Sequence, residues 1–152
     1  MNANAHIKNV DIVFMNWVLH HLTSSSYRKT QKTISQALLK AKSLLKNKES
    51  SFISICEIMY DGIIFDNMPS HIIYHLSTSK ILAPLMKSIS TSANVAGTGV
   101  FFLSRKQWEK IITGVDLKII KYTNGNPIKF PLYQKAFLHL GKIRHAHFWV
   151  SS

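Results

Sequence analysis

The chain has 152 residues, of which 46% are hydrophobic and 17% are charged, so it is long enough for one packed domain and too apolar for an intrinsically disordered protein. Its 19 Lys and Arg residues against 7 Asp and Glu residues give a net charge of +12, which favours a solvated lysine surface over nucleic-acid binding because few of the cations are arginines. A single cysteine excludes an internal disulfide framework, and the lack of a long apolar run excludes a membrane span. With no secretion signal visible, we expect a cytoplasmic protein.

The first part of the sequence predicts a strand, a helix and a second strand. Residues 10–15 form a short apolar run rich in β-branched side chains, which is typical of a strand buried on both faces. The serines at 24–26 offer N-caps, and residues 27–45 place Ile34, Leu38 and Ala41 on one stripe of a helix. Residues 51–57 then return to a strand pattern. This order predicts a right-handed βαβ unit with two parallel strands.

The middle of the sequence, residues 61–99, is less regular. Its apolar positions predict one or two short helices, which Pro69 is expected to interrupt, and the polar residues 88–99 predict a mobile loop. The pair Gly97 and Gly99 belongs to this loop and follows no predicted strand. We interpret residues 61–99 as a helical lid within a single domain that covers residues 1–152.

The last third of the sequence predicts two helices and two strands. Ser104 is the predicted N-cap of a short helix that contains Trp108 as a core anchor and ends at Gly114. The remaining segments are a strand at 117–122, a turn at 124–127, a helix at 136–140 and a terminal strand at 146–150. The fold class is therefore α/β, with helices around a sheet of three or four strands.

Four segments, in this order, resemble class I S-adenosylmethionine (SAM)-dependent methyltransferases. Residues 11–22 resemble the family's fourth strand and following loop, which often shows an aspartate, an apolar strand, a polar residue and a leucine-histidine pair. Residues 44–48 resemble the leucine-leucine-lysine-proline-glycine-glycine end of the next helix, although an asparagine and a lysine replace the proline and the first glycine. Residues 52–57 resemble the fifth strand, which ends in glutamate in several subfamilies. Residues 102–112 resemble the serine-x-x-x-tryptophan helix before the sixth strand.

The resemblance implies an incomplete Rossmann-like sheet, made of the last four strands of a methyltransferase domain and flanked by helices. The family carries a Gly-rich loop that lets the backbone approach the cofactor and an acidic residue that takes the ribose hydroxyls, and both precede these segments. No G-x-G-x-x-G pattern precedes Asp11, so the first three strands are expected to be missing. The strand at 10–15 would then be an exposed apolar edge that promotes association.

His20 and Glu57 leave the carboxyl ends of the two neighbouring predicted strands, where ligands bind in α/β sheets. A carboxylate that orients an imidazole favours the tautomer that accepts a proton. The two residues resemble the His–Glu pair of the carbon-methylating domains of polyketide synthases, which implies His20 as the base and Glu57 as its orienter. The same resemblance implies that Asn16, Trp17 and His21 bind the cofactor. The alternative is that the two histidines cap a turn and Glu57 is a solvated strand end.

The other histidines and the cysteine are weaker candidates for a functional site than His20 and Glu57. His71 and His75 have the i, i+4 spacing that places two metal ligands on one helical face, but no third ligand is evident, so we favour surface histidines and expect no metal. His145 and His147 alternate on one strand face without a carboxylate nearby. Cys56 lies in an apolar strand and is predicted to be buried rather than reactive.

Three functions follow from these observations. The favoured one is methyl transfer from SAM to a small or carrier-bound acceptor, with doubtful activity of the chain on its own. The second is a non-catalytic methyltransferase-like subunit or remnant, whose exposed edge strand docks on a protein partner or on a second copy. The third is a basic nucleic-acid-binding module, for which affinity would fall steeply with salt.

Overall fold

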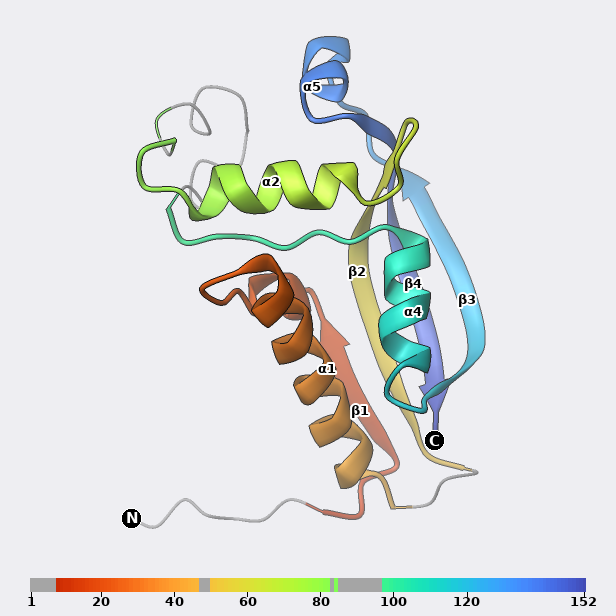
Figure 1. The fold of residues 1–152 in the computed structure, drawn as a ribbon. Coiled ribbons are helices and arrows are strands. Elements are labelled where there is room, and N and C mark those ends of the chain that lie inside the picture. The colour runs from red at the N-terminus through yellow and green to blue at the C-terminus, as the bar shows by residue number, and fades with distance from the viewer. Residues whose placement is uncertain (1–7, 47–49, 83, 85–96) are drawn as a thin grey trace.

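The computed structural model describes residues 8–46, 50–82, 84 and 97–152. In chain order its elements are β1 (Ile12–Asn16), η1 (Leu19–His21), α1 (Tyr27–Leu44), β2 (Phe52–Gly62), α2 (Met68–Thr78), α4 (Arg105–Thr113), β3 (Lys118–Pro127), α5 (Leu132–Phe137) and β4 (Leu140–Ser151). The strands form a 4-stranded sheet in the order β1-β2-β4-β3, in which β1 is parallel to β2 and β4 is antiparallel to both neighbours. Figure 1 shows α1 and α4 in front of this sheet and α2 crossing above them. The predicted α/β class is confirmed.

The unit β1–α1–β2 forms as the sequence predicts. Ser26 is the N-cap of α1, and its hydroxyl accepts a hydrogen bond from the backbone amide of Lys29. The apolar stripe of the helix, Ile34, Leu38 and Ala41, is buried in the core against the sheet. Apolar side chains of β1 and β2 pack against the same stripe. Because α1 carries the chain back to the start of the sheet, the two strands it joins lie parallel and end at the same edge.

Helix α4 also begins and ends as predicted. Ser104 forms a capping box with Gln107, in which each side chain accepts a hydrogen bond from the other residue's backbone amide. The helix then buries Trp108 and Ile112 against the sheet, and Gly114 ends it. Trp108 is 1% exposed, so its predicted role as a core anchor is confirmed.

One prediction for residues 61–99 is wrong where the structure describes them. Pro69 does not interrupt a helix but lies in the first turn of α2, where its missing amide hydrogen costs no hydrogen bond. Gly99, at the end of the predicted loop, has a φ of +85°, and a Cβ added there would come within 2.7 Å of the Thr78 side chain, so this backbone favours glycine. Residues 83 and 85–96 lie outside the described residues, so the predicted lid stays a prediction.

The C-terminal strands are longer than their apolar patterns indicate. The predicted turn at 124–127 is wrong, because β3 continues through it to Pro127 with a register shift against β4. The predicted helix at 136–140 is displaced: α5 ends at Phe137, His139 takes a left-handed φ of 56°, and Leu140 already begins β4. The predicted strand at 146–150 is the end of this longer strand. Pairing with a neighbouring strand on each side extends β4 beyond its most apolar part.

A buried arginine joins three strands at this end of the sheet. Arg144 of β4 is 4% exposed, forms an ion pair with Asp61 of β2, and donates to the Asn124 amide oxygen of β3 at 2.7 Å. The Arg144 Nε also lies within hydrogen-bond distance of the Tyr122 hydroxyl, at 3.3 Å. Hydrogen bonding to Asp61 and Tyr122 outweighs burial and raises the pKa of the guanidinium, so it remains charged. The register shift in β3 is therefore held by polar contacts that no local sequence pattern reveals.

We expect Arg144→Ala to lower the free energy of unfolding by about 2–4 kcal/mol, because it leaves the Asp61 carboxylate without its partner and creates a cavity. Arg28→Ala is the matched control, since Arg28 is an exposed arginine that forms none of the described ion pairs. Its loss should cost less than about 1 kcal/mol. Urea denaturation measures both values. Equal losses of unfolding free energy in the two variants would show that the buried contacts of Arg144 do not stabilise the fold more than a surface arginine does.

The first strand lies at one edge of the sheet and is exposed on one face. Helix α1 covers the inward face of β1, whereas Ile12 and Phe14 on the opposite face are 39% and 62% exposed. Within the part of the chain that the structure describes, β1 pairs with β2 alone. The prediction of a strand buried on both faces is therefore wrong, and that of an exposed apolar edge describes β1 as it stands. None of the described helices is long and apolar enough to cross a bilayer.

Candidate functional site

The candidate site lies where β1 ends and β2 continues. The last ladder hydrogen bond runs from the Trp17 amide to the Cys56 carbonyl, at 2.9 Å, and Trp17 then takes a left-handed φ of 58°. This conformation costs a non-glycine residue free energy, so it persists only where the surrounding contacts enforce it. It turns the chain sharply off the sheet into η1, which carries Leu19 and His20 back over the end of the strand.

Glu57 is not at the end of its strand, as the sequence pattern indicated. It lies one residue beyond the last β1 partner, Cys56, while β2 runs on to Gly62 in pairing with β4. Since β1 has ended, the space beside Glu57 is filled by η1 rather than by a strand. His20 and Glu57 therefore lie together as expected. His20 follows the end of β1, whereas Glu57 lies within β2.

His20 and Glu57 form a buried pair at this place. The His20 Nδ1 lies 2.6 Å from one carboxylate oxygen of Glu57, and the Leu19 amide donates to the other oxygen at 2.8 Å. The exposed fractions of His20 and Glu57 are 7% and 1%. The alternative that Glu57 is a solvated strand end is therefore wrong. Because the carboxylate binds Nδ1–H, the neutral imidazole keeps its unprotonated nitrogen at Nε2.

The His20 ring is held from its other sides as well. It stacks on Phe102 with ring centroids 5.0 Å apart, and the His21 ring lies against it at 4.1 Å. The His20 carbonyl accepts the Phe101 amide at 2.8 Å, which fastens η1 to the segment before α4. No described residue hydrogen-bonds Nε2. The imidazole is thus fixed in orientation, and one nitrogen is available as a proton acceptor.

The three residues predicted to bind a cofactor lie at or just after the same strand end. Asn16 and His21 are exposed, and Trp17 is 49% exposed with its ring stacked on His145 at 4.8 Å. Burial lowers the pKa of His21 and the neighbouring His20 lowers it further, while Glu57 opposes the shift. His21 is therefore uncharged near neutral pH. These three side chains, the rim, do not share one face: Asn16 pairs with Cys56 and the Trp17 ring stacks on His145, on the sheet face opposite to that of Glu57, whereas His21 lies against His20.

The remaining histidines and the cysteine lie elsewhere. His71 stacks on Tyr27 with ring centroids 3.6 Å apart, and His75 lies on the same face of α2 at 6.4 Å. In the described ranges no group of three His, Cys, Asp or Glu side chains is placed to hold a metal ion. His147 lies 2.7 Å from the Ser54 hydroxyl through Nε2. Cys56 lies in β2 and is partly buried.

Sequence reasoning missed three parts of the site. The Leu19 amide, the Phe102 ring and the His145 ring all contact its residues, but none of them carries a local signal for that role. Phe102 lies in an apolar run that also fits a plain core segment. His145 was noted for its alternation with His147, and its position opposite Ile58 on β4 brings it under Trp17. These contacts join segments far apart in the sequence, so only the fold reveals them.

No family model and no curated protein matches the sequence. Among solved structures, the chain is similar to LepI in complex with SAH and a substrate analogue, with a TM-score of 0.52 and 12% identity over 95% of this chain and 26% of LepI. It is also similar to the cyclopropane synthase MmaA2 from Mycobacterium tuberculosis, with a TM-score of 0.55 and 12% identity over 96% of this chain and 56% of the synthase. The chain is likewise similar to a SAM-dependent methyltransferase from Methanosarcina mazei, with a TM-score of 0.51 and 12% identity over 97% of this chain and 61% of that protein.

Identities this low establish the fold alone. The chain therefore has the fold of part of a class I methyltransferase domain, as the resemblance of its four segments predicts. It spans between 26% and 61% of the length of these three proteins. A shared fold does not establish that this chain binds or catalyses what those complete proteins do.

Proposed function

We propose that this methyltransferase-like chain takes part in methyl transfer from SAM to a small or carrier-bound acceptor. The observation that carries the proposal is the buried pair of His20 and Glu57 beside the carboxyl end of β1, where α/β sheets bind their ligands. An imidazole and a carboxylate that are both more than nine-tenths buried are costly to hold in a structure. Such a pair with a free nitrogen is typical of a general base.

The residues around the pair fit a cationic cofactor. SAM carries a sulfonium. Glu57 supplies a negative charge behind His20, and His21 beside that ring is uncharged. Asn16 and Trp17 offer polar and aromatic groups on the other face of the same strand end. No lysine or arginine contributes to these contacts. The described residues supply neither a Gly-rich turn after a strand nor a second carboxylate at this edge. They therefore form one wall of a cofactor site, and we expect weak affinity for SAM.

The proposed mechanism needs little from the protein beyond alignment and proton removal. When bound, SAM supplies a methyl group that is already activated by the sulfonium. Glu57 keeps the proton of His20 on Nδ1, so Nε2 is the atom that accepts a proton from the methyl acceptor. Phe102 and η1 fix the plane of the ring, which positions Nε2 without reorganisation. Burial excludes water from the Glu57 side and strengthens this contact.

Calorimetry with SAM tests the proposal. We expect saturable binding of SAM in the millimolar range. Trp17→Ala should bind SAM roughly tenfold more weakly, because it removes an indole ring that is 49% exposed at the rim. Phe65→Ala is the matched control, since Phe65 is an aromatic side chain that is 61% exposed away from the rim. It should leave the affinity unchanged. Absence of binding at several millimolar SAM, or equal losses in both variants, would overturn the cofactor assignment.

A second role, self-association, rests on the exposed edge of β1. We propose that the edge pairs with the same edge of a second copy, because Phe14 and Ile12 expose apolar surface beside unpaired backbone groups. Phe14→Lys should then reduce the mass measured by light scattering to that of a monomer. Ile64→Lys is the control, since Ile64 is 76% exposed in the connection after β2. A wild-type chain that stays monomeric at high concentration would end this proposal.

A further inference from the structure

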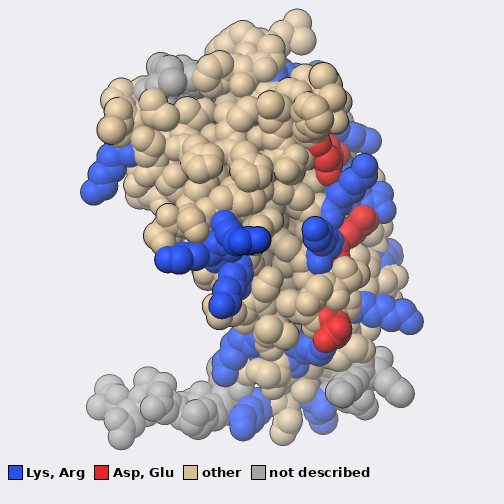
Figure 2. Space-filling model, in the orientation of Figure 1, with Lys and Arg blue, Asp and Glu red and all other residues tan. Residues whose placement is uncertain are grey.

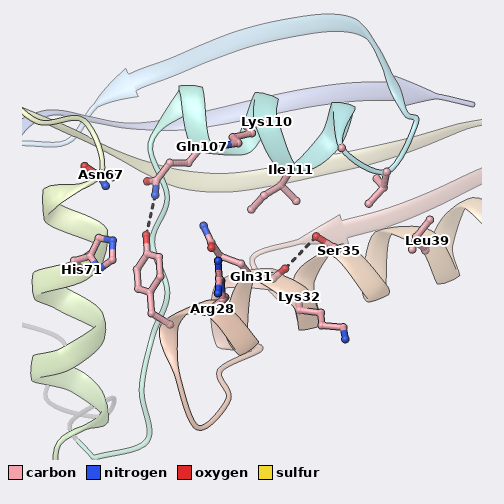
Figure 3. A pocket seen from close by; sticks show the side chains of 13 residues that line it. Arg28, Gln31, Lys32, Ser35, Leu39, Asn67, His71, Gln107, Lys110 and Ile111 are labelled. Atoms are coloured by element: carbon pink, nitrogen blue, oxygen red, sulfur yellow. Dashed lines mark hydrogen bonds between the residues drawn. The ribbon is translucent and has the colours of Figure 1, made fainter.

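A second concave site lies between α1, α2 and α4, on the helical side of the sheet. It is a cleft of about 850 Å³, a size typical of sites for small organic ligands. Neither His20 nor Glu57 lines it. Figure 3 shows Gln107 and Ile111 of α4 and Gln31 of α1 pointing into the space between the two helices. Asn67 and His71 of α2 lie at one end, and the Lys32 side chain points away from α4. Any ligand bound there would be independent of the proposed methyl-transfer site.

The charges that line the cleft have one sign. Arg28 and Lys32 come from α1 and Lys110 comes from α4, whereas no Asp or Glu is among the lining residues. All three cations are exposed, and no described carboxylate forms an ion pair with them. In Figure 2 basic side chains lie over the middle, the lower part and the right-hand margin of this face, and the few visible acidic side chains lie toward that margin. Cations left in one hollow without counter-charges favour an anionic occupant.

Neutral hydrogen-bonding groups line the end of the cleft near α2. The Gln107 amide donates to the Tyr27 hydroxyl at 2.8 Å, and the same hydroxyl lies 2.8 Å from Ser70, so this wall is rigid. Asn67 is the N-cap residue of α2 but makes no capping hydrogen bond with its side chain. Its amide is therefore available to a ligand oxygen. His71 lies beside it, stacked on Tyr27.

The opposite end of the cleft is apolar. Leu39 of α1 and Ile111 of α4 line it together with Val115, and Leu39 is 48% exposed. The cleft thus offers an amide at its α2 end, aliphatic surface at its other end and cations between the two. A lone inorganic ion would leave the aliphatic end empty. An organic molecule with an anionic group matches both ends.

We propose that this cleft binds a small phosphate-bearing organic molecule, with its phosphate near Arg28 and Lys110. Phosphate is the favoured anion because it carries up to two charges and three acceptor oxygens, which match a lysine and the fork of an arginine. The aliphatic side chains Leu39 and Ile111 contact the organic part. The site adds a ligand that the proposed methyl transfer does not require.

Pyrophosphate is the probe for the cationic end of the cleft. Calorimetry on the full chain at low salt should show saturable binding with one site, and Arg28→Gln and Lys110→Gln should each weaken it by roughly tenfold. Both side chains are exposed, so neither variant is expected to unfold the chain. Lys121→Gln is the matched control, because Lys121 is an exposed lysine of β3 that does not line the cleft. It should bind pyrophosphate like the unaltered chain.

Three results would overturn the proposal. Failure to saturate would show that pyrophosphate binds as a diffuse counterion, and so would a Lys121→Gln loss equal to that of Lys110→Gln. A single-stranded oligonucleotide that displaces pyrophosphate with a much higher affinity and a steep salt dependence would assign the basic face to nucleic acid instead. Trp17→Ala should leave pyrophosphate binding unchanged. Failure of SAM to bind would therefore leave this proposal standing, and failure of pyrophosphate to bind would leave the methyl-transfer proposal standing.

Discussion

His20→Ala is expected to lower the rate of methyl transfer by about 10²–10⁴-fold, the usual contribution of a positioned general base. The variant removes the imidazole whose Nδ1 lies 2.6 Å from Glu57, so no group remains at this place to accept the acceptor's proton. The assay follows label from methyl-labelled SAM into a panel of small and carrier-bound acceptors. Because the chain forms only one wall of the cofactor site, the assay uses it joined to an N-terminal methyltransferase half with a Gly-rich loop.

His75→Ala is the matched control for this experiment. His75 is an exposed histidine on α2 that contacts neither Glu57 nor His20, so its loss should leave the rate unchanged. Circular dichroism establishes that both variants are folded. Full activity of His20→Ala would remove the base assignment, even if SAM binds.

Glu57→Ala is expected to lower the free energy of unfolding by about 3–5 kcal/mol. Glu57 is 1% exposed, and its two carboxylate oxygens bind the Leu19 amide and the His20 ring. The variant leaves both of those buried donors without a partner and opens a cavity between β2 and η1, and each unsatisfied donor costs about 1–3 kcal/mol. Urea denaturation measures the loss.

Glu57→Gln separates the structural role of this residue from its role in positioning His20. The glutamine keeps the shape and can still accept the Leu19 amide through its oxygen, so the loss of stability should stay below about 2 kcal/mol. Its amide nitrogen now donates to Nδ1, which moves the imidazole proton to Nε2 and blocks proton acceptance. The variant should be folded and inactive. An active Glu57→Gln variant would show that the carboxylate serves stability alone.

The elements predicted correctly are those whose signals are local. Ser26 and Ser104 mark the starts of α1 and α4 because a serine N-cap acts within the first helical turn. The stripe of Ile34 and Leu38 marks the buried face of α1 because its spacing follows the helical period. These signals depend on a few neighbouring residues, so no knowledge of the sheet is needed to interpret them.

The elements predicted incorrectly depend on distant partners. The segment at 124–127 has the composition of a turn, yet Arg144 on β4 binds the Asn124 side chain and β3 continues. Pairing between β4 and both neighbours likewise extends the strand from the predicted 146–150 back to Leu140. Strand length in a sheet is decided by pairing with neighbouring strands, which composition does not report.

Some features of the candidate site could likewise be predicted from the sequence, and others could not. The positions of His20 and Glu57 after predicted parallel strands were enough to bring them together, because such strands end at one edge. The burial of Glu57, the contribution of the Leu19 amide and the left-handed Trp17 depend on how η1 folds back over the strand end. The basic cleft draws its lining from three helices, so a charge count could indicate cations but not their gathering in one hollow.

The central claim is that His20 presents an unprotonated Nε2, backed by Glu57, to a site that accepts a sulfonium cofactor. Nitrogen-15 NMR of the histidine, asparagine and tryptophan side chains, recorded with and without SAM, measures both parts of the claim at once. The account predicts a His20 signal of the Nδ1–H tautomer at neutral pH, together with SAM-dependent shifts of the Asn16, Trp17 and His21 side chains. A proton on Nε2, or a rim whose signals stay unmoved by millimolar SAM, would contradict it.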